Sequence, residues 1–379
     1  MTIVYTCRIA DAFGVALDEV ANFVDNPDGG GAALDYALNV GGVGALSLTL
    51  PVSYPKGNLV LDGRIGVWRS INGRTPTLDG QAIFLIRKWR YTAEAITVTA
   101  YHANSLLKRR IIAYYTGTSY TLKNANFAGN QIKAFAKENL GTSISSANRI
   151  GLETQADVSA YLSVQADLAD GVAIAAQDAY SNLYDLIVGI SNASTQAGTY
   201  MTAEVVAPTE STLELRTFAT VRGVDHRASS GQPVILSEDT GSLTNCVLEI
   251  DRSNEVTYAI CAGAGPANNR LTASSSDDTR MSESPFNRIE VFGDYTTITD
   301  QTVLQDKADA LVRAGRPRTE FTAEVVDTDA VTRGIDYDLG DLVTASFQGV
   351  QYDCRMDVFG VTVGGGKQTS KARIRYVDG

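Results

Sequence analysis

The feature that most constrains this 379-residue chain is a set of short segments in which apolar and polar residues alternate between glycine-containing turns. In residues 45–51, Leu46, Leu48 and Leu50 face one side of an extended chain, and Ser47 and Thr49 face the other. Alternation with a period of two is typical of a β-strand with one buried face. Further strands are expected at 3–9, 64–70, 81–91 and 95–101. Short strands joined by turns predict a β-barrel or sandwich over residues 1–108.

The pattern changes after residue 101. Residues 105–110 (SLLKRR) are expected to form a helical turn that leaves the barrel, and residues 126–141 have apolar side chains at helical spacing. Asn126 is a candidate N-cap of that helix and Gly141 a candidate C′ residue. A second helix is expected over 177–190. A hairpin should follow, formed by 200–206 and 212–218. Residues 109–240 therefore predict an inserted α/β domain.

Strand patterns resume near residue 241. Strands are expected at 246–250, 255–262, 287–292, 320–326, 341–347, 350–363 and 369–377. Residues 263–285 are rich in Gly, Ser, Asn and Asp and predict a loop. Residues 299–314 predict a helix that ends at Gly315 and Pro317. The expected fold class is β-rich α+β: two similar β-barrel domains, residues 1–108 and 241–379, with the inserted α/β domain at 109–240.

Composition narrows the possible functions. The net charge of −11 argues against specific nucleic-acid binding, because affinity for phosphates comes from Lys and Arg. No segment approaches the roughly 20 apolar residues of a membrane-spanning helix, and the first residues lack the pattern of a secretory signal. Cys7, Cys246, Cys261 and Cys354 are far apart in sequence and are expected to be buried thiols, with Cys246 and Cys261 on neighbouring strands.

Catalytic patterns are scarce. The two histidines, His102 and His226, are expected to be structural, and no G-x-S-x-G motif accompanies them. The glycine-rich segments 41–46 and 261–266 lack the spacing of nucleotide-binding loops. Residues 25–28 and 275–278 are acidic but do not follow the EF-hand pattern, and a pair of carboxylates for glycoside hydrolysis leaves no visible signature. We therefore expect no enzyme activity and no catalytic, cofactor-binding or metal-binding residues.

Three segments carry a resemblance to a known family. They are residues 38–51 (LNVGGVGALSLTLP), the succession of strands from 67 to the Leu-Leu-x-Arg-Arg exit at 110, and residues 336–343 (DYDLGDLV) before the closing strands. Together these segments resemble the tail hub, or tail-tip and baseplate hub, proteins of siphophages. Within the LGD motif, we expect Gly340 to allow a tight turn and Asp341 to accept hydrogen bonds from backbone N–H groups.

The resemblance implies a structural protein of the virion tail tip, assembled in the bacterial host cytoplasm. Two barrels per chain in a homotrimer would give a ring with pseudo-sixfold symmetry between the tail tube and the tip, around the DNA exit channel. The implied partners are distal tail and tail tube proteins, the tape measure protein, and tip or fibre proteins. DNA would pass through a lumen that we expect to be neutral to acidic. Two alternatives stay open, a tail-associated cell-wall hydrolase and an adhesin that binds a host receptor or carbohydrate.

Overall fold

The structure is a computed structural model that describes residues 2–21, 23, 32–114, 122–140, 150, 158, 160–178, 180–266, 269–364 and 367–377. Its internal contacts divide the chain into two compact units. Unit 1 consists of Met1–Cys246 and Thr322–Val377, and unit 2 consists of Val247–Phe321. The acidic segment 25–28 and Gly141 lie outside the described residues.

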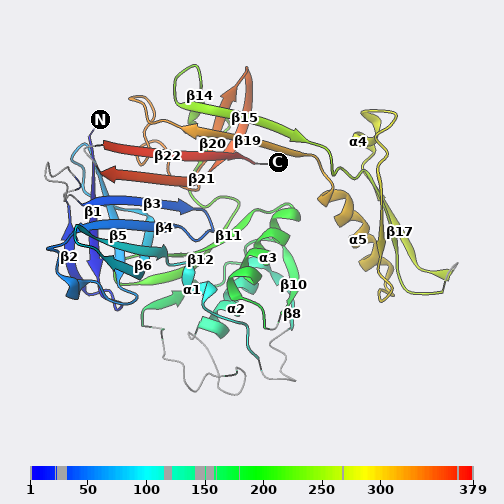
Figure 1. Cartoon of the computed structure of the whole chain (residues 1–379). Coiled ribbons are helices and arrows are strands. Elements are labelled where there is room, and N and C mark those ends of the chain that lie inside the picture. Colours follow the sequence, from blue (N-terminus) through cyan, green and yellow to red (C-terminus); the bar gives the residue numbers. More distant parts are fainter. Residues whose placement is uncertain are drawn as a thin grey trace. The chain divides into compact units, whose positions relative to one another are not determined.

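The largest element is a 14-stranded sheet, mostly antiparallel, whose strand order is β15-β19-β22-β21-β3-β4-β7-β6-β5-β1-β2 (Figure 1). The strands β13 and β14 pair in parallel with β20, and β20 pairs with β21. The bounds are β1 (Ile3–Ala10), β2 (Ala16–Val20), β3 (Ala33–Asn39), β4 (Ala45–Pro51), β5 (Arg64–Ile71), β6 (Thr77–Tyr91), β7 (Ala95–His102), β13 (Asp225–His226), β14 (Ile235–Ser237), β15 (Leu243–Asp251), β19 (Arg318–Val325), β20 (Leu342–Phe347), β21 (Val350–Gly364) and β22 (Lys367–Tyr376). A 3₁₀ turn, η1 (Lys56–Asn58), follows β4.

The two ends of the chain meet inside this sheet. The late strand β21 pairs with the early strand β3, with Val361 opposite Tyr36. Leu46, Leu48 and Leu50 are buried and Ser47 is exposed, as their alternation predicts. The β-rich fold is thus confirmed. The pairings of the described strands form one open path, and the closure of each end into its own barrel stays a prediction.

The middle of the chain forms two small sheets and three helices. Its elements are α1 (Ser105–Lys108), β8 (Leu122–Phe127), α2 (Ala128–Leu140), β9 (Leu162–Val164), β10 (Ala173–Gln177), α3 (Leu183–Gln196), β11 (Met201–Val206) and β12 (Leu213–Ala219). The strands β8 and β10 pair with each other, and β12 pairs with β11 and β9. The expected hairpin is confirmed as β11 and β12. The second expected helix starts later than predicted, at Leu183, because Asn182 caps it through a hydrogen bond from the N–H of Tyr184.

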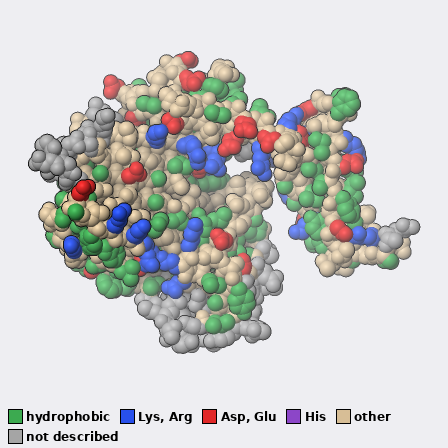
Figure 2. All heavy atoms as spheres, in the orientation of Figure 1, with side chains coloured by type: hydrophobic (Ala, Val, Ile, Leu, Met, Phe, Trp, Pro, Cys, Tyr) green, Lys and Arg blue, Asp and Glu red, His purple; other side chains and the backbone are tan. Residues whose placement is uncertain are grey.

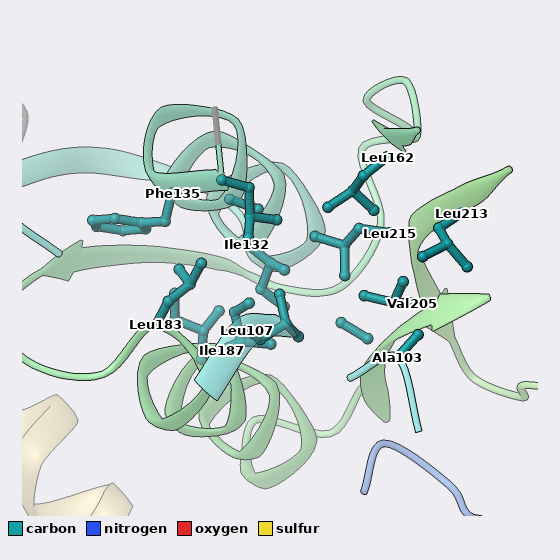
Figure 3. Packing of buried hydrophobic residues seen from close by; sticks show 14 of the residues in the cluster. Ala103, Leu107, Ile132, Phe135, Leu162, Leu183, Ile187, Val205, Leu213 and Leu215 are labelled. Carbon is teal, nitrogen blue, oxygen red and sulfur yellow. The ribbon is translucent and has the colours of Figure 1, made fainter. Parts of the chain in front are cut away.

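These middle elements share one apolar core with the N-terminal strands. Ile132 and Phe135 of α2, Leu183 and Ile187 of α3, and Val205 of β11 belong to one cluster of buried residues, part of which Figure 3 shows. The same cluster contains Ile83 and Leu85 of β6 and Leu107 of α1. The middle of the chain therefore packs directly against β6. The division into three domains at 108/109 and 240/241 stays a prediction.

Unit 2 is a small two-layer structure. The sheet order is β17-β16-β18, with β16 (Tyr258–Ala262), β17 (Thr272–Ser276) and β18 (Glu290–Asp294). The helix α5 (Gln301–Ala314) covers one face of this sheet, and its Leu304 and Ala308 are fully buried with Cys261. The helix expected over 299–314 is therefore present. The segment expected as a loop at 263–285 differs, since it contains β17 and the short helix α4 (Asp278–Ser282).

Candidate functional site

The feature of unit 1 that stands out chemically is a group of mostly buried polar and charged side chains beside the large sheet, of which only Asp338 is partly exposed. We call Tyr36, Arg69, Asp79, Arg333 and Asp338 the Asp79 cluster. Arg333 and Asp79 are almost completely buried, at 1% and 2% exposed, and Arg69 is buried as well. Charged groups are seldom buried without partners, because removing them from water is costly. Each of these buried charges therefore has a partner within the cluster.

Asp79 reaches the interior because β6 is interrupted around it. Leu78 pairs with Trp68 of β5, whereas the next paired residue of β6, Ile83, lies opposite Gly66. The extra residues of β6 form an irregularity in which Gly80 and Gln81 have positive φ angles of 60° and 53°. Bulges of this kind redirect side chains. Here the interruption accompanies a buried carboxylate that accepts a hydrogen bond from the hydroxyl of Tyr36.

Arg333 lies between β19 and β20 and neutralises this carboxylate. Its two terminal nitrogens donate to the two oxygens of Asp79 at 3.1 and 2.9 Å, in a bidentate arrangement. Its Nε donates to Asp338 at 3.0 Å, and its guanidinium carbon lies 3.1 Å from the centre of the Phe359 ring. Burial opposes the charge of Arg333, but Asp79 and Asp338 raise its pKa above the ordinary value. The arginine therefore stays charged within the protein.

Arg69 completes the cluster from β5. Its Nη2 lies 3.3 Å from Asp79 and donates to Asp338 at 3.1 Å. Burial by itself would raise the pKa of Asp338, but the two arginines hold it below its ordinary value. Two arginines and two aspartates thus balance each other in charge. The cluster ties β5 and β6 to the segment before β20.

A second set of contacts joins the middle of the chain to the same place. Arg222, which follows β12, donates through Nε to Glu204 of β11 at 2.7 Å. Its other nitrogens donate to the carbonyl oxygens of Leu339 at 2.9 Å and Gly80 at 3.1 Å. Glu204 also accepts a hydrogen bond from the N–H of Gly41 at 2.7 Å. All three regions that the sequence distinguishes therefore converge on one buried polar site.

The LGD motif lies within this site. Asp341 accepts hydrogen bonds from the N–H groups of Val224 and Asp338, both at 2.6 Å. Gly340 has a φ of +87°, and a Cβ there would lie 2.6 Å from the Cδ of Arg222. The expected roles of Gly340 and Asp341 in a tight turn are confirmed. Burial raises the pKa of Asp341 in spite of these hydrogen bonds.

The residues singled out for chemistry are not brought together. His102 is buried, burial lowers its pKa to about 4, and its Nδ1 accepts a hydrogen bond from the N–H of Asn104. His226 contacts the carbonyl oxygen of Gln232 at 3.0 Å, and its Nε2 is 3.8 Å from Asp341. The expected adjacency of Cys246 and Cys261 is wrong, because β15 belongs to the large sheet and β16 to the small one.

The acidic segment 275–278, a candidate ion-binding loop, uses a carboxylate within the fold. Asp277, in the acidic segment 275–278, caps α4 and pairs with Arg280 at 2.8 Å. Within the described part of the chain, no group of three or more His, Cys, Asp or Glu side chains is arranged to hold a metal ion. No helix of the described residues is long and apolar enough to cross a membrane. The absence of catalytic and metal sites stays a prediction.

Sequence reasoning missed the Asp79 cluster. The available signal is weak: Asp79 precedes the apolar run AIFLI, and Arg333 stands in a polar segment rich in aspartate. Neither residue reveals its partner, since 254 positions separate them. The arrangement is charge-balanced, with its carboxylates paired and its arginines buried. Its ion pairs and hydrogen bonds hold distant segments of the chain together.

The comparisons with known proteins agree with this picture of a structural molecule. The family model described as Siphovirus ReqiPepy6 Gp37-like protein matches residues 40–374. No curated protein matches the sequence significantly.

Three solved structures have the same fold over nearly the whole chain. The 43 kDa tail protein of prophage MuSo2 from Shewanella oneidensis has a TM-score of 0.56 at 11% identity, covering 98% of each chain. A tail protein from Neisseria meningitidis has a TM-score of 0.55 at 12% identity, covering 98% of this chain and 96% of that one. The prophage tail protein gp18 from Listeria monocytogenes has a TM-score of 0.50 at 10% identity, covering 97% of this chain and 94% of that one. The match over residues 40–374 shows that the chain belongs to the Siphovirus ReqiPepy6 Gp37-like protein family, a family of siphovirus tail proteins.

Proposed function

We propose that this tail protein is the hub of the tail tip or baseplate, a non-enzymatic subunit that forms a homotrimeric ring around the DNA exit channel. The observation that carries the proposal is the way both ends of the chain join in one sheet through β3 and β21. The Asp79 cluster fastens the same two ends in the interior. A subunit that transmits load between a tube and a tip needs its end regions to behave as one rigid body.

The symmetry argument concerns the two β-rich ends. If each end contributes one barrel-like body, three chains present six such bodies, which matches the sixfold symmetry of a tail tube. Repeated heterologous contacts produce a closed ring when the rotation between subunits closes. The proposed partners are the tail tube and distal tail proteins on one side, and tip or fibre proteins on the other, with the tape measure protein in the channel. The fold likeness to three tail proteins, two of them from prophages, supports this placement.

Native mass spectrometry of the purified protein, and of tail tips that contain it, tests the proposal. We expect a species of three times the chain mass of 40.4 kDa. A chain that remains monomeric both when purified and within tails would contradict the hub. A zymogram with host cell walls tests the absence of enzyme activity, and clearing of the walls would contradict it.

A further inference from the structure

The charges of this acidic protein are segregated along the chain. Residues 51–114 contain ten of the 32 Lys and Arg residues but only three of the 43 Asp and Glu residues. That segment therefore carries a net charge of +7. The remaining 22 basic and 40 acidic residues give the rest of the chain a net charge of −18. A positive region persists within a molecule that is negative elsewhere.

Much of this positive charge lies at the end of β6 and at α1. We call Arg87, Lys88, Arg90, Lys108 and Arg109 the basic surface, and all five side chains are exposed. Figure 2 shows Lys and Arg side chains gathered in the area where Figure 1 places β6. Arg87 and Arg109 donate to the same oxygen of Asp62, at 3.0 and 2.8 Å.

Among the described residues, three cations of the basic surface have no carboxylate partner, and one of these, Lys108, lies instead 4.7 Å from the centre of the Tyr184 ring. Among the described residues, no carboxylate lies within ion-pair distance of Lys88 or Arg90, and Asp62 is the one carboxylate that pairs with the basic surface. Like charges that crowd together repel each other, and this repulsion disfavours the compact state. An anionic partner would remove that repulsion.

The position of the basic surface on β6 explains why it is uncovered. Ile83 and Leu85 of β6 lie under the core of the middle elements. A shift in the pairing of β6 with β7 between Ile86 and Lys88 follows, and beyond it Lys88 and Arg90 lie opposite Thr99 and Thr97. Tyr101 of β7, at 40% exposed, lies at the boundary between the covered and uncovered parts. Arginine and tyrosine are enriched at protein interfaces.

We propose that the basic surface is the docking surface for an acidic face of a second copy of this chain. The inference rests on the proposed ring, since it names one side of the contact that would join its subunits. A heterologous contact needs two different, complementary surfaces on each chain, and the segregation of +7 from −18 supplies opposite signs within one molecule. A nucleic acid fits less well, because the net charge of −18 outside residues 51–114 would repel its phosphates.

The double variant Lys88→Glu with Arg90→Glu tests this assignment. Its matched control is Lys307→Glu with Arg313→Glu, which makes the same change in charge at two exposed positions of α5. Association of the full-length chains is measured by sedimentation at several concentrations, at about 0.05 M and about 0.5 M salt. We expect the Lys88 and Arg90 variant to raise the dissociation constant of the assembly by about tenfold or more at low salt. The control should assemble like the wild type, and salt should weaken the wild-type assembly.

The outcomes separate the two proposals. If the wild type assembles and the Lys88 and Arg90 variant assembles equally well, the docking surface is wrong and the ring stands. If the wild type stays monomeric alone and within tails, both proposals are wrong.

Immobilised duplex DNA serves as a further probe. The proposal would be overturned if the DNA retained the wild type but not the Lys88 and Arg90 variant at about 0.15 M salt while the two proteins assembled equally well. The basic surface would then be a binding surface for a phosphate polymer. Circular dichroism and thermal unfolding confirm that both variants fold.

Discussion

Both units of the protein bury an arginine among carboxylates, but the two arginines connect segments at very different separations along the chain. Arg333 of unit 1 binds Asp79, which lies 254 residues away. Arg280 of unit 2 donates to Asp277 at 2.8 Å and to the carbonyl oxygens of Val312 and Gly315, each at 3.0 Å and within 35 residues. The first arginine therefore holds together the two ends of the chain, and the second holds together one local unit. The same chemistry should have global consequences in unit 1 and local ones in unit 2.

The substitution Arg333→Ala should have the largest effect. It leaves Asp79 buried without its main partner, and breaking a buried ion pair in this way costs about 3–5 kcal/mol of unfolding free energy. Urea denaturation measures this loss. The control Arg227→Ala removes a half-exposed pair with Asp225 and should cost less than about 1 kcal/mol. If Arg333→Ala prevents folding, the variant Arg333→Met with Asp79→Asn should recover part of the stability, because neither charge is then left alone. Equal losses in Arg333→Ala and Arg227→Ala would contradict the structural role of the cluster.

Acid should weaken unit 1 more than unit 2, because the buried His102 lies in unit 1. Burial lowers the pKa of His102 from 6.5 to about 4. Between these two values the unfolded chain binds more protons than the folded one, so stability is full above pH 6.5 and is lost as the pH falls toward 4. The contribution is about 3 kcal/mol at most, since each pKa unit is worth about 1.4 kcal/mol. The free energy of unfolding, measured from pH 4 to 7, should depend less steeply on pH in His102→Asn than in the wild type. An equal pH dependence in the two proteins would contradict this role of His102.

The substitution Arg280→Ala should have a smaller and more local effect. It removes hydrogen bonds that hold the end of α5 to α4, which we expect to cost about 2 kcal/mol. Hydrogen exchange is the appropriate measurement, because it reports local opening. Protection should fall in residues 247–321 and stay unchanged in β3 and β21. Loss of protection across both units would show that removing Arg280 is not a local change and would contradict the contrast with Arg333.

The smallest contrast compares two glycines of unit 1. Gly340 and Gly349 both have positive φ angles, +87° and +77°. A Cβ at Gly340 would collide with Arg222, whereas one at Gly349 would meet nothing within 4 Å. Gly349→Ala should therefore cost only about 1 kcal/mol of backbone strain, and Gly340→Ala about 1 kcal/mol more. Thermal unfolding of the two variants measures the difference. Equal costs would mean that the contact of Gly340 with Arg222 contributes nothing.

Local patterns predicted much of this fold because their causes are local. The alternation at Leu46, Leu48 and Leu50 identifies β4 with its buried face, since period two and burial coincide in a sheet. The apolar spacing of 299–314 identifies α5, and Asp300 caps it by accepting hydrogen bonds from the N–H groups of Thr302 and Val303. Gly340 and Asp341 were identified because turn chemistry depends on neighbours in sequence.

The remaining features depend on distant contacts. The strand β17 was missed because its sequence, TASSS, is typical of a loop, and its pairing with β16 and the cover of α5 stabilise it. The Asp79 cluster was missed because a carboxylate in a strand looks like a surface residue until its arginine is placed. The pairing of β21 with β3 joins the ends of the chain in a way that no short pattern records.

The separation of Asp79 from Arg333 also has a consequence for synthesis. Ribosomes add about 5–20 residues per second, so Asp79 is made roughly 10–50 s before the arginine that neutralises it. During that interval the nascent strands β5 and β6 contain a carboxylate that water must solvate, and the sheet cannot close over it. We expect unfinished chains to remain open to proteases during translation. Only chains translated past Arg333 can complete the fold and compete for a place in the growing tail.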